Sequence, residues 1–234
     1  FGTSVSSNLI DSTKNSDLII VLGARLGEMT TQGYSIISPQ DISKNIIHIH
    51  VDPNELNKVF NANVCINVGV NECCDRLEEL TLDNSNRWKE WRNELNKNYL
   101  EDSKPKKNRN INNLSKIFEI VEKKFPTNSI ITLDAGNNAA WPQRFLSFGS
   151  TRRQIASTCG SMGYAIPAAV SSALSNPEKA VLCCVGDGGF MMSSQEISTA
   201  VHYGAKIIIL LINNCSYATI RMHQERDYPG RKIA

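Results

Sequence analysis

The chain has 234 residues, 41% of them hydrophobic and 21% charged, a composition that suits one large or two modest globular domains and excludes extensive disorder. The 25 Lys and Arg residues nearly balance the 23 Asp and Glu residues, so the net charge of +2 gives no general attraction to nucleic acid. Apolar runs such as Ile207–Ile212 are far shorter than the roughly 20 residues of a membrane helix. We expect a globular protein with neither nucleic acid nor a membrane as its partner.

Seven cysteines occur in the chain, and no two of them form a Cys-x-x-Cys pair. Most lie within apolar runs, which predicts free, buried thiols. This use of cysteine is typical of a reducing compartment, so we expect a cytoplasmic protein. The chain starts at Phe1 and stops at Ala234 without a closing element, from which we expect a fragment of a longer protein.

The first third of the chain alternates strand-like and helix-like segments. Two short apolar runs, Asp17–Leu22 and Asn45–Val51, are typical of buried parallel strands, and each ends in a turn-forming sequence. A helix can begin within residues 55–61, and residues 71–82 have the spacing of an amphipathic helix. We predict the second half of a doubly wound α/β domain over residues 1–83.

Between residues 84 and 112 the composition shifts to Asn, Lys, Arg, Glu and Trp, and we expect this segment to be a linker between two domains. It contains the basic run Lys104–Arg109, which has no interleaved aromatic residues. A solvated linker is therefore favoured over the alternative, a nucleic-acid site.

From residue 113 onward, βα units repeat with short connections. Helix-like segments alternate with strand-like runs at Ser129–Leu133, Ala180–Val185 and Lys206–Ile212. Right-handed crossovers make such strands parallel and bring their carboxyl ends to one edge of the sheet, where we expect the functional residues. We predict an α/β chain of two doubly wound domains with mainly parallel sheets, the second over residues 113–234.

Polar residues follow two of these strands. One strand runs into Gly186-Asp187-Gly188-Gly189, and the next along the chain runs into an Asn pair that ends at Asn214. If the strands are neighbours, the Asp carboxylate and the Asn amide oxygen converge, and hard oxygen ligands suit Mg²⁺ completed by water and phosphate. The glycines let backbone N–H groups at the helix start approach an anion. The pattern predicts a magnesium-bound diphosphate, although Gly-Asp-Gly-Gly taken alone is more typical of a tight connection from strand to helix with an N-cap Asp.

The 27 positions from Asp187 to Asn214 resemble the thiamine diphosphate signature, in which Gly-Asp-Gly is followed by a helix, a strand and an Asn pair. Three further segments, in the same order along the chain, resemble acetolactate-synthase-like enzymes: Asp134–Trp141, Gly160–Ala169 and Thr219–Arg231. The chain is thus similar to the thiamine diphosphate-dependent enzymes of the acetolactate synthase-like family. The resemblance covers part of the family's central domain and most of its diphosphate-binding domain, and leaves out the amino-terminal domain.

The resemblance implies roles for the residues at the diphosphate end of the site. Asp187 and Asn214 match the magnesium ligands, and the backbone carbonyl of Ser216 matches a third ligand. Asn137 and Asn138 match the pair that reaches the diphosphate, where acetolactate synthases usually carry Gln-His. This departure speaks against acetolactate synthase itself.

At the ring end of the site, the resemblance implies that Gly160 presents its backbone carbonyl to the aminopyrimidine and that Met162 holds the cofactor bent. The cofactor then supplies an ylid that adds to pyruvate or another 2-oxo acid with loss of CO₂. The implied activity is that of a carboligase like acetolactate synthase, in branched-chain amino acid biosynthesis. The alternatives are a decarboxylase or carboligase with a different acceptor, and a non-catalytic binding module that keeps the fold.

Leu22–Gly27 and Ile46–Pro53 resemble the strand ends that contact FAD in flavin-containing members of the family. Leu26, Gly27 and His50 depart from that pattern, so FAD is the less favoured alternative. The resemblance also implies a homodimer or tetramer with sites shared between subunits, in which an activating glutamate comes from the amino-terminal domain of a neighbour. We expect the 234 residues alone to be inactive for that reason.

Overall fold

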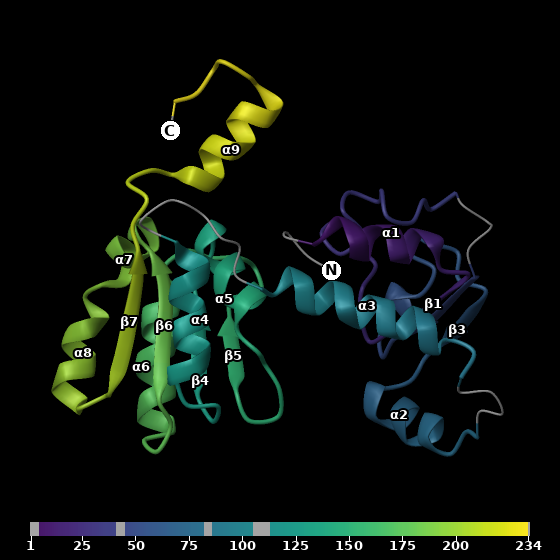
Figure 1. The fold of residues 1–234 in the computed structure, drawn as a ribbon, viewed down its shortest axis with the longest axis horizontal. Helices are drawn as coiled ribbons and strands as arrows, with labels where there is room; N and C mark the ends of the chain where they lie inside the picture. Colours follow the sequence, from purple (N-terminus) through teal and green to yellow (C-terminus); the bar gives the residue numbers. More distant parts are fainter. Residues whose placement is uncertain (1–4, 41–44, 82–85, 105–112, 234) are drawn as a thin grey trace. The chain divides into compact units, whose positions relative to one another are not determined.

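The computed structural model describes residues 5–40, 45–81, 86–104 and 113–233. The chain divides into two compact units, Phe1–Asp102 and Ser103–Ala234 (Figure 1). Each unit contains one parallel sheet together with helices, which confirms the predicted α/β class. The division falls within the segment 84–112 expected to be a linker, and most of the basic run in that segment lies outside the described residues.

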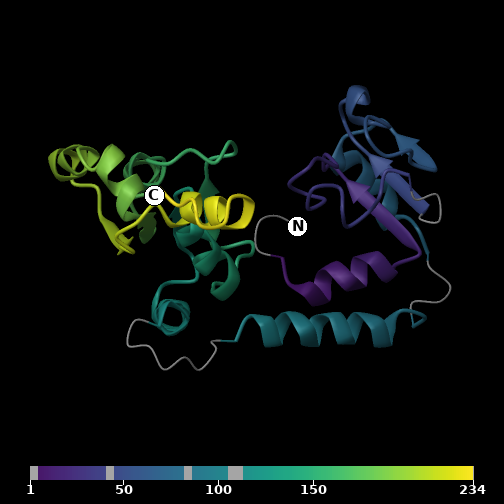
Figure 2. The ribbon, with the colours of Figure 1, turned by 90° about the horizontal axis from the view of Figure 1, so that it is seen from above.

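In the described part of the first unit, a three-stranded parallel sheet has the order β1-β2-β3. Its strands are β1 (Leu18–Leu22), β2 (Asn45–Ile49) and β3 (Val64–Ile66). The helices are α1 (Ser7–Asn15), α2 (Val70–Glu78) and α3 (Lys89–Asp102), and Figure 2 shows α1 beside α3. The core of this unit lies between the sheet and the loops that follow β1 and η1, with Val21, Ile36, Ile37, Ile46 and Phe60 at its centre.

Both strands predicted in the first unit are confirmed, but the helix predicted within residues 55–61 is wrong. A single 3-10 turn, η1 (Pro53–Glu55), stands there instead. Asn57 has a φ of 56°, and its Oδ1 accepts a hydrogen bond from the Ala62 N–H at 2.9 Å. A left-handed residue held by its own side chain turns the backbone away from a helix, which explains the difference.

In the described part of the second unit, a four-stranded parallel sheet has the order β5-β4-β6-β7. Its strands are β4 (Ile130–Leu133), β5 (Arg153–Ala156), β6 (Val181–Gly186) and β7 (Ile207–Ile212). The helices are α4 (Leu114–Lys124), α5 (Ala140–Phe145), α6 (Ala165–Ser175), α7 (Asp187–Ser193), α8 (Glu196–Tyr203) and α9 (Ala218–Asp227), with a 3-10 turn η2 (Asn137–Ala139). None of the described helices is both long and apolar enough to cross a membrane.

Helices cover both faces of the second sheet because its central strands are apolar on both sides. Along β6, Val181, Cys183 and Val185 pack in one cluster with α6 and α8. The alternate residues Leu182 and Cys184 pack in a second cluster with α4 and α5. Successive side chains of a strand point to opposite faces, so the continuous apolar run of β6 requires a helical layer on each side. This is the doubly wound arrangement that the sequence predicts.

All seven cysteines are free, but the expectation that most are buried is wrong. Burial holds for Cys73, Cys183 and Cys184, whereas Cys65, Cys159 and Cys215 are exposed and Cys74 is half-buried. Cys159 and Cys215 lie in the connections that follow β5 and β7, where the chain has already left the core.

Candidate cofactor site

The connections that leave β4, β6 and β7 meet at one edge of the second sheet. Gly186, the last residue of β6, is in register with Ile212, the last residue of β7. Asp187 and Asn214 therefore follow neighbouring parallel strands on the same edge. Asp134 follows β4 directly, and its N–H donates to the Cys184 carbonyl of β6 at 3.1 Å. The connection that leaves β4 therefore begins at the same edge. The predicted convergence of the Asp and Asn ligands requires that their two strands be neighbours, and β6 and β7 meet this condition.

The chain passes from β6 into α7 without an intervening loop. Asp187 is the first residue of α7, and Gly188 and Gly189 complete its first turn. A β-carbon at Gly188 would lie 2.9 Å from Met162 Cε, and one at Gly189 would overlap the Asp134 carboxylate. A side chain at Gly189 would have to displace the buried Asp134 carboxylate, whereas one at Gly188 would displace only the flexible end of Met162.

The Asp187 carboxylate is half-buried, and none of the described residues donates a hydrogen bond to it. The connection after β7 is folded by two side-chain turns: Asn213 Oδ1 accepts from the Cys215 N–H at 2.8 Å, and Asn214 Oδ1 accepts from the Ser216 N–H at 3.1 Å. Cys215 between them has a φ of 51°. The turns hold Asn214 and Ser216 in one compact loop beside the start of α7.

Among the described residues, no three His, Cys, Asp or Glu side chains gather in a group that could hold a metal ion. The ligands predicted from the sequence are one carboxylate, one amide oxygen and one backbone carbonyl. Such a set suits Mg²⁺, because this ion takes few protein ligands and completes its octahedral shell with water and phosphate oxygens. The donors at this edge therefore fit magnesium in company with a diphosphate.

Asn138 lies between the ends of β4 and β6. Its Oδ1 is 3.0 Å from the β-carbon position of Gly136 and 3.5 Å from that of Gly186. Its Nδ2 is buried and has no hydrogen-bond partner among the described residues. An unpaired buried donor costs about 1–3 kcal/mol, and an anionic oxygen at this sheet edge would remove that cost. The neighbourhood of Asn138 thus fits the diphosphate that the sequence predicts.

Gly160 and Met162 lie in the connection between β5 and α6. Gly160 has a φ of +70°, which a residue with a side chain adopts only with strain. Met162 is 38% exposed and packs its end against Gly188. The structure therefore brings the Met162 loop and the Asp187 helix into contact.

Two residues of this edge are missed in the sequence-based prediction. Thr219 in α9 accepts a hydrogen bond through Oγ1 from the Asn137 N–H at 3.1 Å, which joins α9 to the turn η2 that follows β4. Asp134 is buried, with its carboxylate against α6 and α7. The signal for Asp134 is its position directly after a buried strand, whereas nothing in the sequence indicates the contact of Thr219.

Two family models match the chain. Residues 134–234 match "Thiamine pyrophosphate enzyme, C-terminal TPP binding domain", and residues 1–77 match "Thiamine pyrophosphate enzyme, central domain". The chain belongs to the thiamine pyrophosphate enzymes. The two matches fall on separate structural units, so each domain of this family has its own sheet here.

Curated relatives of this thiamine pyrophosphate enzyme include acetolactate synthase large subunits. The chain is 30% identical over 220 residues to that of Buchnera aphidicola subsp. Schizaphis graminum, with 92% of the chain aligned. It is 30% identical over 227 residues to the probable large subunit of Methanocaldococcus jannaschii (92% of the chain), and 26% identical over 233 residues to the isozyme 3 large subunit of Escherichia coli K12 (93%). The chain spans 38% of the length of each of these relatives.

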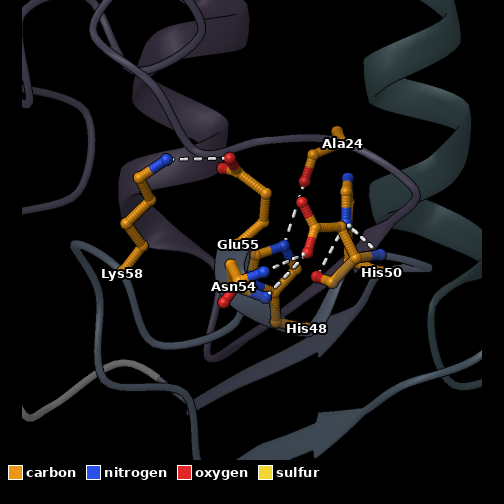
Figure 3. A network of polar contacts seen from close by, with 7 residues as sticks. Ala24, His48, His50, Asn54, Glu55 and Lys58 are labelled. Carbon is orange, nitrogen blue, oxygen red and sulfur yellow. Dashed lines mark hydrogen bonds and ion pairs between the residues drawn. The ribbon is translucent and has the colours of Figure 1, made fainter.

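The central domain of this thiamine pyrophosphate enzyme contains a cavity of about 520 Å³ at the strand ends that resemble the flavin-contacting segments. Arg25 and Lys58 in its lining are balanced by Glu28 and Glu55. Lys58 Nζ is already paired with Glu55 Oε1 at 2.8 Å (Figure 3). The charged side chains of the lining therefore balance, so they give no net electrostatic attraction to an anion such as a diphosphate.

His48 closes one side of the same cavity. It is 2% exposed, and its Nε2 lies 3.0 Å from the Ala24 carbonyl oxygen (Figure 3). Because a carbonyl oxygen can only accept, His48 Nε2 carries a proton and donates it in this hydrogen bond, which holds the ring against the segment that follows β1. His50 Nδ1 accepts the Asp52 N–H at 3.0 Å, so this ring is also committed to the local backbone.

Proposed function

We propose that the chain is part of a thiamine diphosphate- and Mg²⁺-dependent carboligase or decarboxylase that acts on pyruvate or another 2-oxo acid. The observation that carries the proposal is that Asp187 and Asn214 follow neighbouring parallel strands at one sheet edge, near the unpaired buried amide of Asn138. Similarity to acetolactate synthase large subunits supports the acetolactate synthase-like reaction.

The residues that would hold the cofactor come from the connections at this edge. Mg²⁺ would be bound by Asp187, Asn214 and the Ser216 carbonyl, and the diphosphate by Asn137, Asn138, Gly186, Gly188 and Gly189. When bound, thiamine diphosphate supplies a carbon nucleophile that adds to a carbonyl and accepts the electron pair released with CO₂. Asp187 would offset the charge of the metal, since it is the one carboxylate of the proposed ligand set.

The apolar side chain of Met162 would lie at the ring end of the site, with Gly160 presenting its carbonyl beside it. Met162 is already braced by Gly188, so it can define one wall without adjustment on binding. A braced wall orients bound groups at little entropic cost. We place the activating glutamate on the amino-terminal domain of a neighbouring subunit. The active species would therefore be a homo-oligomer of a longer chain, and we expect it in the cytoplasm.

A decarboxylase or a carboligase with a different acceptor is the second candidate. The observation that favours it is the Asn pair at 137 and 138, where acetolactate synthases usually carry Gln-His. Product analysis separates the candidates: with pyruvate as the only substrate, the complete protein yields acetolactate if it is a synthase and acetaldehyde with CO₂ if it is a simple decarboxylase.

Calorimetry on the complete protein tests the metal assignment. Asp187→Ala is expected to weaken magnesium-dependent thiamine diphosphate binding by more than about 100-fold, because the charged ligand is lost. Glu196→Gln is the matched control: it removes a half-buried carboxylate from α8, where Glu196 accepts from Thr199, and is expected to leave binding unchanged. An unchanged affinity and magnesium dependence in Asp187→Ala would show that the ligand assignment is wrong.

A further inference from the structure

Asp134 is a buried carboxylate at the junction of β4, α6 and α7, and it is 3% exposed. Its Oδ1 accepts hydrogen bonds from the Tyr164 N–H at 2.9 Å and the Ala165 N–H at 3.4 Å. These N–H groups begin α6, whose N-cap residue Tyr164 makes no capping bond with its own side chain. Asp134 therefore caps α6 from a neighbouring strand.

The second oxygen of the same carboxylate has an unusual environment. Asp134 Oδ2 is buried without a hydrogen-bond partner among the described residues, and it occupies the space that a β-carbon of Gly189 would need. A buried oxygen without a donor costs about 1–3 kcal/mol of stability. The carboxylate thus contacts α6 through one oxygen and α7 through the other, and the second contact is not explained by hydrogen bonding within the fold.

The two contacts of Asp134 fall on the two halves of the proposed cofactor site. Tyr164, which it caps, follows Met162 by two positions, and Gly189, which it touches, follows Asp187 by two positions. We propose that Asp134 is a positioning residue that sets the separation between Met162 and the first turn of α7, and hence between the ring end and the metal end of the site. This inference rests on the proposed function.

The contacts around Asp134 explain how it acts without touching a ligand itself. Gly163 has a φ of +83°, and a β-carbon there would lie 3.1 Å from Met192 Cβ, so the loop and α7 already pack closely. Removal of the carboxylate frees the Tyr164 and Ala165 N–H groups and opens space beside Gly189. The Met162 loop can then move relative to Asp187, while the connections that carry Asn138 and Asn214 are unchanged.

The variant Asp134→Asn in the complete protein tests the inference. It keeps the shape of the side chain but loses the charge and introduces an amide donor. In the cofactor-free protein, hydrogen exchange at the Tyr164 and Ala165 amides is expected to accelerate by about tenfold, because a charge-assisted cap is weakened. In the loaded enzyme, kcat is expected to fall by about tenfold while the KM for thiamine diphosphate changes by less than about threefold.

Thr132→Val is the matched control for a purely structural effect. Thr132 Oγ1 donates to the Ala165 carbonyl at 2.9 Å, so it also ties β4 to α6, but among the described residues it makes no hydrogen bond to the Met162 loop or to α7. We expect a lower Tm with unchanged kcat and unchanged exchange at Tyr164. A kcat loss in Thr132→Val equal to that in Asp134→Asn would overturn the positioning role.

Gly189→Ala disturbs the same carboxylate from the side of α7, and it is the variant to measure if Asp134→Asn does not fold. Its methyl group would displace Asp134, so exchange at Tyr164 and Ala165 is expected to accelerate. Gly149→Ala, where no atom lies within 4 Å of the new methyl group, is its control. Unchanged exchange in both Asp134→Asn and Gly189→Ala overturns the inference. Failure of the wild-type protein to bind thiamine diphosphate overturns the proposed function instead. The exchange measurement is made without cofactor, so it still tests whether Asp134 holds the start of α6.

Discussion

Met162 Cε lies 2.9 Å from the position that a β-carbon would take at Gly188, so the end of the Met162 side chain rests on the first turn of α7. Met162 as a whole residue is 38% exposed. The contact joins the connection between β5 and α6 to the helix that begins at Asp187. A single apolar side chain thus bridges the two ends of the proposed cofactor site.

Met162→Ala is expected to lower kcat by about 10- to 100-fold and to change the dissociation constant of thiamine diphosphate by less than about threefold. The physical reason is that Met162 shapes the ring end, whereas the diphosphate is held elsewhere. Steady-state kinetics and calorimetry on the complete protein measure the two quantities. Met191→Ala removes a methionine that is 76% exposed on α7 and is the control. Equal losses of turnover and affinity in Met162→Ala would contradict its role as a wall.

Arg152→Met is expected to destabilise the protein by about 2 kcal/mol, because it leaves the half-buried Glu122 without its counter-charge and removes the hydrogen bonds of a buried guanidinium. Arg152 is 3% exposed and pairs with Glu122. Its guanidinium also donates to Ser129 Oγ and the Phe125 carbonyl, each at 3.3 Å. Urea unfolding measures the effect. Arg153→Met, at the exposed neighbouring position, should change stability by less than about 0.5 kcal/mol, and an equal loss there would refute the prediction.

The same ion pair predicts a contribution to acid sensitivity. Burial raises the pKa of Glu122, but hydrogen bonds from Arg152 and Ser147 and the charge of Arg152 outweigh burial and lower the pKa below the ordinary 4.5. A lowered native pKa stabilises the fold above pH 4.5, and this stabilisation is lost as the pH falls through the native value. Glu122→Gln should therefore be less stable than wild type at neutral pH and show a shallower fall of Tm below pH 4.5. Parallel Tm curves for the two proteins would contradict this.

Alkylation of the native protein is expected to modify Cys159 long before Cys183 and Cys184. Hydrogen bonds with the Ser157 and Ser161 side chains lower the pKa of the exposed Cys159 thiol. Burial raises the pKa of Cys183 to about 11 and that of Cys184 to about 12. A difference of at least about 100-fold in rate follows, since each pKa unit changes the thiolate fraction tenfold.

Peptide mass spectrometry after timed iodoacetamide treatment measures these rates. The double variant Ser157→Ala, Ser161→Ala should slow the labelling of Cys159 because both hydrogen bonds to the thiol are removed. Labelling of Cys183 at the rate of Cys159 in the folded protein would contradict the burial of β6.

The purified complete protein is expected to carry no obligatory flavin. The cavity in the central domain has balanced charges, and its Lys58 is paired with Glu55. An absorbance spectrum checks this prediction. A stoichiometric yellow cofactor whose removal abolishes activity would contradict it and would place the protein nearer to acetolactate synthases that use FAD.

Much of the sheet could be predicted from the sequence because its central strands are continuous apolar runs. Leu182 and Cys184 alternate with residues buried on the opposite face, and such a run is stable only between two helical layers. β5 was not predictable in this way, since Arg153 and Gln154 are polar and exposed. It is a strand because β4 offers it a free row of backbone hydrogen-bonding groups.

The residues Asp187 and Asn214 could be assigned to one sheet edge from the sequence by itself, because neighbouring parallel strands with right-handed crossovers end on the same side. The role of Asp134 could not. An Asp after a strand is read equally well as a turn residue, and only tertiary packing shows that its carboxylate meets Tyr164 in α6 and Gly189 in α7. Strand ends follow from local periodicity, whereas contacts between side chains distant in sequence depend on how the helices pack on the sheet.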